Sequence, residues 1–168
     1  IFLAYSTTSL TGRHLGAGRR DLALRSGVEA TWLAGGIGAV AAILLAVFAS
    51  PLFTWLGADA ATLPHALAYL RSSAPGLIGM FVVLAATGTL RGFQDTRTPL
   101  IAASVGAAFN AVANWVLMYP LGLGVAGSGL GTALTQTLMA LFLGGIVARS
   151  ARREGVSLKP STYGLFAS

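Results

Sequence analysis

The sequence contains no cysteine and few charges: Asp, Glu, Lys and Arg make up 10% of its 168 residues. Average soluble domains carry about 25% charged residues, so this composition excludes an ordinary water-soluble domain. The absence of cysteine excludes both a disulfide framework and thiolate chemistry.

Long apolar stretches are present instead. Three runs contain no Asp, Glu, Lys or Arg: residues 30–58, 72–90 and 98–148, which are 29, 19 and 51 residues long. A helix needs about 20 mostly apolar residues to cross a bilayer. The runs therefore predict an all-α integral membrane protein.

The longest run is long enough for two crossings, and its middle contains a break. Pro120, Gly122 and Gly124 interrupt helix there, because Pro and repeated Gly are strong helix punctuators. Trp115 and Tyr119 precede the break and are typical of the aromatic belt at a membrane interface. Together the runs predict four transmembrane spans, at about 30–56, 67–90, 99–119 and 127–148.

The basic residues test this count, because Lys and Arg concentrate in short cytoplasmic loops. With four spans, ten of the 11 basic residues fall on one side and only Arg71 on the other. Three spans would divide them almost evenly. We therefore expect the Arg-rich loops 11–29, 91–98 and 149–160 to be cytoplasmic. Because the net charge of +6 belongs to these loops, it does not indicate nucleic-acid binding.

Two prolines predict local features of the second and third spans. Pro75 lies within the second span and is expected to kink it. Pro99 suits a helix start, where Thr96 or Thr98 could supply the cap.

Residues 1–10 are similar to the end of a preceding span, and 149–168 to a cytoplasmic loop and the start of a further segment. We therefore expect the chain to be part of a larger protein.

No carboxylate lies within any predicted span. The acidic residues and histidines all fall in loops or at helix ends: Asp21, Glu29, Asp59, Asp95, Glu154, His14 and His65. Ion and proton sites in membranes usually depend on such groups, so a proton-coupling residue is missing from these spans. Without paired carboxylates or a metal-binding motif, the sequence also does not predict an enzyme.

The polar groups that remain in the spans are amides and hydroxyls. Asn110 and Asn114 are four residues apart in the third span and share one helix face, which Gly106 continues. Their amide oxygens could bind a cation or a substrate. The alternative is a hydrogen bond to a neighbouring helix, worth about 0.6–2 kcal/mol. Thr132 and Thr135 lie on the fourth span, and hydroxyls there often bond their own backbone.

Three connecting segments carry a family signature. Residues 90–99 (LRGFQDTRTP), 121–128 (LGLGVAGS) and 12–20 (GRHLGAGRR) resemble, respectively, the loops after helices four, five and two of the MATE family of multidrug and toxic compound extrusion transporters. The resemblance is nearest to the DinF-like branch. It implies that the chain is part of the N-terminal six-helix lobe of a twelve-helix, two-lobe antiporter.

The resemblance also implies a function and a site. Such antiporters export small cationic or amphiphilic compounds by alternating access, in exchange for Na⁺ or H⁺ and without a cofactor. Asn110, Asn114 and Thr132 match cation-site positions, and Thr87 matches a frequently polar position. Asn114 departs from the pattern, because an acidic residue is frequent there and an amide cannot release a proton. The implied partners are the lipid bilayer of the inner membrane, small-molecule substrates and the remaining helices of the protein.

Two other functions are compatible with these features. A flippase for lipid-linked saccharides belongs to the same superfamily, but its cavity should contain basic residues, and no Lys or Arg lies deep within these spans. A membrane scaffold that transports nothing would need only the small residues that pack helices closely.

Overall fold

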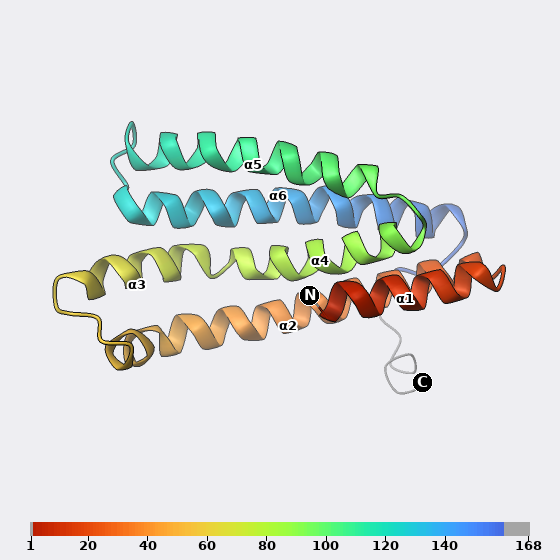
Figure 1. Ribbon diagram of the computed structural model, residues 1–168, viewed down its shortest axis with the longest axis horizontal. Coiled ribbons are helices and arrows are strands. Elements are labelled where there is room, and N and C mark those ends of the chain that lie inside the picture. The colour runs from red at the N-terminus through yellow and green to blue at the C-terminus, as the bar shows by residue number, and fades with distance from the viewer. Residues whose placement is uncertain (1, 160–168) are drawn as a thin grey trace.

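The computed structural model describes residues 2–159, and every regular element in that range is a helix (Figure 1). In chain order the helices are α1 (Phe2–Gly16), α2 (Arg20–Trp55), α3 (Thr62–Ser73), α4 (Gly76–Gly92), α5 (Arg97–Met118) and α6 (Gly124–Arg153). The predicted start of a further segment after residue 159 lies outside the described residues.

The helices confirm the predicted all-α membrane fold. α2, α5 and α6 are each long and apolar enough to cross a bilayer. α3 and α4 together pass the same test, although they are bent by 48° at the break between them. Pro75 lies in this break, as expected, because proline has no N–H to continue the helical hydrogen bonds.

The Arg-rich segments were predicted as loops, but much of their length is helical. α2 begins at Arg20, ten residues before the predicted span, and α6 continues to Arg153. Only residues 17–19 lie between α1 and α2. Charge-free runs mark the part of a helix that is apolar enough for lipid, whereas Arg and Glu are good helix formers that extend the helix beyond it.

The start of α5 corrects the predicted cap. Neither Thr96 nor Thr98 caps the helix with its side chain; instead Oδ1 of Asp95 accepts a hydrogen bond from the backbone N–H of Thr98 at 3.0 Å. The hydrogen bonds from the side chain and backbone of Thr98 lower the pKa of the Asp95 carboxyl. Asp59 accepts from the N–H of Thr62 at the start of α3 in the same way, at 2.7 Å.

The helices run so that the basic segments meet at one end of the bundle. The α1–α2 and α4–α5 turns and the end of α6 lie at one end, and the α2–α3 and α5–α6 turns lie at the other (Figure 1). The main apolar cluster is at the basic end, where Leu24 and Val28 of α2 pack with Leu143 and Val147 of α6. This arrangement is the alternation that the positive-inside count predicts.

The segment after α6 folds back onto α2. Glu154 pairs with Arg20 at 3.1 Å, and the indole N–H of Trp32 donates to the carbonyl of Leu158 at 2.9 Å. Val156 and Leu158 also pack against the apolar cluster. The basic end is therefore held together by both polar and apolar contacts.

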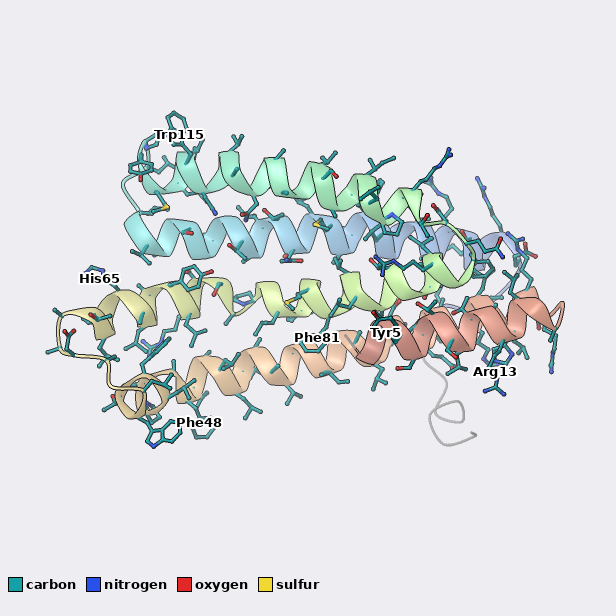
Figure 2. All side chains as sticks on the ribbon, viewed as in Figure 1. Tyr5, Arg13, Phe48, His65, Phe81 and Trp115 are labelled. Atoms are coloured by element: carbon teal, nitrogen blue, oxygen red, sulfur yellow. The ribbon has the colours of Figure 1, made fainter. Side chains whose placement is uncertain are left out.

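Large apolar side chains point outward along the helices. Val47 on α2, Leu100 on α5 and Leu141 on α6 are 64%, 67% and 69% exposed. Figure 2 shows Trp115 at the end of the bundle opposite Arg13, as expected of an interfacial aromatic residue. These faces suit a bilayer, where lipid tails surround the bundle.

Small residues let the central helices approach closely. A Cβ at Gly76 of α4 would lie 2.7 Å from Cα of Ala133 on α6, and one at Gly79 would lie 2.6 Å from the carbonyl oxygen of Gln136. α4 and α6 thus contact each other through their backbones, as small residues allow in membrane helices.

Candidate functional site

A chain of hydrogen bonds joins α5 to α6 inside the bundle. Nδ2 of Asn114 donates to Oδ1 of Asn110 at 3.2 Å, and Nδ2 of Asn110 donates to Oγ1 of Thr135 at 3.3 Å. Thr135 in turn donates to the carbonyl of Gly131 at 2.8 Å. The two asparagines therefore share one helix face, as their spacing predicts, and the bond to Thr135 is the interhelical contact that the alternative interpretation required.

One atom of this network has no partner. Oδ1 of Asn114 is buried and accepts no hydrogen bond in the described part of the chain. It points at Gly131 of α6, where an added Cβ would collide with it. A buried unsatisfied carbonyl oxygen costs about 1–3 kcal/mol, so a polar or cationic ligand at this oxygen would offset an existing cost.

Thr132 is placed differently. It follows Gly131 on α6 and is half-buried, but its hydroxyl donates to the carbonyl of Ser128 in its own helix at 3.0 Å. Among the described residues no hydrogen bond connects it to either asparagine. Its oxygen has lone pairs left for a ligand, whereas its proton is used by the backbone.

Thr87 lies nearer to the basic end of the bundle than the amide network does. Gly76 meets Ala133 and Gly79 meets Gln136, so α4 and α6 run in the same direction at this contact. This register places Thr87 level with residue 144 of α6, about 13 Å beyond the level of Thr135 at 1.5 Å per residue. The structure therefore does not bring Thr87 to the amide network.

Thr135 is the network member that the sequence places on the fourth span but that is not among the candidate site residues predicted from it. The spacing could have indicated Thr135, because it lies four residues after Gly131 and thus on the same helix face. A run of hydroxyl residues on one helix does not reveal which one faces α5, since that depends on the packing of the two helices.

The network consists of neutral groups. Amide and hydroxyl oxygens are ligands for hard cations, but they supply no negative charge. In residues 2–159 no group of three or more His, Asp or Glu side chains could hold a metal ion. The network can therefore bind or orient a cation or a polar substrate, and a carboxylate that neutralises the cation would come from other residues.

The fold and this partly buried network define a multi-pass membrane protein with polar groups between its helices. A family model described as MatE matches residues 1–116, which is more than half of the chain. The chain belongs to the MatE family, whose members are transporters and not enzymes.

Curated relatives agree with this assignment. DNA damage-inducible protein F of Escherichia coli is 31% identical over 160 residues, which are 94% of this chain and 34% of that protein. Protein DETOXIFICATION 44 of Arabidopsis thaliana, described as chloroplastic, is 36% identical over 66% of this chain and 22% of that protein. The probable multidrug resistance protein NorM of Geobacillus kaustophilus is 30% identical over 80% and 30%. The chain thus spans about a third or less of the length of these relatives.

Solved structures share the fold. An outward-facing MATE family transporter aligns with a TM-score of 0.79 at 25% identity, over 99% of this chain and 36% of that one. An inward-facing MATE family transporter aligns with a TM-score of 0.80 at 23% identity, over 90% and 39%, and shows the fold alone.

Proposed function

We propose that this chain forms part of an antiporter that exports small cationic or amphiphilic compounds in exchange for Na⁺ or H⁺. Membership of the MatE family supports transport, and the relative described as a multidrug resistance protein supports export of drug-like compounds. A solved relative at 25% identity that is described as outward-facing supports a cavity open to one side of the membrane, as alternating access requires.

The proposed coupling site rests on one observation, which is that Oδ1 of Asn114 is buried and has no hydrogen-bond partner in the described part of the chain. This oxygen, Oδ1 of Asn110 and the hydroxyl of Thr132 are the proposed cation ligands in this chain. Because all three are neutral, the protein needs a carboxylate from outside these helices to complete the site. Thr87, remote from the network, is proposed to contact substrate instead.

The basic end of the bundle is proposed to be cytoplasmic, with the protein in the inner membrane. Ten of the 11 basic residues flank the spans at this end, and orientation follows such a bias. A transported compound would then leave toward the α5–α6 turn.

Reconstitution tests the proposal. The full-length protein in liposomes should move a fluorescent cationic dye against an imposed Na⁺ or pH gradient, and reversing the gradient should reverse the direction of movement. Asn114→Asp should add a proton-releasing group and shift the pH dependence of dye movement. Dye movement that ignores both gradients would contradict antiport.

A further inference from the structure

A shallow apolar groove runs between α5 and α6, with a volume of about 260 Å³. Among the described residues Thr135 is the only polar one that lines it; the others are Ile101, Ala102, Val105, Gly106, Phe109, Leu138, Met139 and Phe142. Its rim is open, since Val105 is 63% and Phe142 54% exposed. In a bilayer this groove would be filled by hydrocarbon.

The groove leads toward the basic end of the bundle. A Cβ at Gly106 would lie 2.5 Å from Sδ of Met139, and Asn110 bonds Thr135, so α5 and α6 run antiparallel. The same register places Arg97 level with residue 148 of α6. Arg97 precedes Ile101 by four residues, and Arg149 follows Phe142 by seven, so each arginine continues a row of groove residues on its helix.

These two arginines are not neutralised within the bundle. Both are exposed, and in residues 2–159 the ion pairs are those of Arg20 with Glu154 and Arg25 with Glu29. Asp95 lies two residues before Arg97 and keeps its charge, but its carboxylate accepts hydrogen bonds from the backbone at the start of α5 and forms no ion pair with either arginine in residues 2–159. Figure 2 shows nitrogen-tipped side chains gathered where α5 begins and α6 ends. The groove is therefore apolar along its length, with the positive charges of Arg97 and Arg149 at the end where α5 begins.

We propose that this groove binds one acyl chain of an anionic phospholipid, whose phosphate lies between Arg97 and Arg149. The length agrees: from Arg97 to Phe109 α5 rises about 18 Å, close to the ~15 Å hydrocarbon depth of one leaflet. Two arginines without carboxylate partners favour a headgroup with net negative charge over a zwitterionic one. The bound chain would reach Thr135, which places lipid against the helix pair that carries the amide network.

Native mass spectrometry of the full-length protein tests this proposal, with palmitoyl-oleoyl phosphatidylglycerol and phosphatidylcholine as the probes. The unmodified protein should retain phosphatidylglycerol about tenfold more tightly than phosphatidylcholine. The Arg97→Gln/Arg149→Gln variant should lose this preference. Val105→Trp, which fills the groove and keeps both charges, should weaken phosphatidylglycerol binding.

Arg13→Gln/Arg19→Gln is the matched control, because it removes two exposed arginines at the same end of the bundle. Figure 2 shows Arg13 on α1, on the opposite side of the bundle from α5. This variant should keep the preference for phosphatidylglycerol. All substituted residues are exposed, and unchanged circular dichroism will confirm that the variants fold. The proposal is overturned if both lipids bind equally, if the control loses as much as the groove variant, or if neither lipid binds because another helix or a second copy covers the groove.

Discussion

Asn114 donates a hydrogen bond to Oδ1 of Asn110, 3.2 Å away, and leaves its own Oδ1 buried against Gly131 without a partner. The pair is therefore asymmetric. Oδ1 of Asn110 accepts from Asn114 and its Nδ2 donates to Thr135, whereas Oδ1 of Asn114 accepts no hydrogen bond among the described residues. This available oxygen is the physical basis of the proposed cation site.

Gly131→Ala tests the space around that oxygen. The new Cβ would collide with Oδ1 of Asn114, so we expect the α5–α6 contact to lose about 1–3 kcal/mol and the melting temperature in detergent to fall. Gly145→Ala is the matched control on α6, because nothing lies within 4 Å of a Cβ there. An equal melting temperature for the two variants would argue against the observed packing of Asn114.

Asp95→Ala tests the cap of α5. We expect a loss of about 1 kcal/mol, measured by chemical denaturation, and a smaller loss for Asp95→Asn, whose oxygen can still accept from Thr98. The lowered pKa of Asp95 means that its carboxylate stabilises the fold above the ordinary value of 3.8. That contribution disappears only as the pH falls through the lowered pKa. The difference between Asp95→Ala and the natural protein should thus be constant near neutral pH; a dependence on pH there would contradict this cap.

Pro75→Ala tests the origin of the 48° bend. Residue 75 would regain an N–H able to bond the carbonyl of Arg71, so α3 and α4 should straighten. Spin labels at Thr62 and Arg91, both exposed, should then move apart in an electron paramagnetic resonance distance measurement.

The control for this measurement is Pro64→Ala. Pro64 lies in the first turn of α3, where the N–H of a residue has no helical partner, so the label distance should stay the same. If Pro75→Ala also left the distance unchanged, the packing of Gly76 and Gly79 on α6 would be the cause of the bend instead.

The sequence predicted most of the fold because the bilayer restricts it strongly. Charge-free length and Arg placement locate spans and alternate their directions, and Pro75 marks the break. The sequence did not locate the helix ends, since helices continue into charged segments such as the start of α2 at Arg20. It also did not predict that Asp95 rather than a threonine caps α5, because several residues near a helix start can accept the same N–H.

The candidate site was predictable only in part. Spacing placed Asn110 and Asn114 on one face, and this is confirmed. The choice between Thr132 and Thr135 as their neighbour depends on how α6 is rotated against α5. Gly127 and Gly131 set that rotation. Because they have no side chains, the backbone of Leu117 and the amide of Asn114 occupy the space where a Cβ would lie. The roles of Asn110, Asn114, Thr132 and Thr87 in transport stay predictions.

The most direct test of the coupling site is the ion concentration that gives half-maximal dye export by the full-length protein in liposomes. In Asn114→Leu, which removes the free oxygen, this concentration should rise about tenfold or more. Thr137→Val is the control, because the hydroxyl of Thr137 donates to the carbonyl of Ala133 in its own helix and lies outside the network. An unchanged half-maximal concentration and rate in Asn114→Leu would contradict a cation site at Asn114.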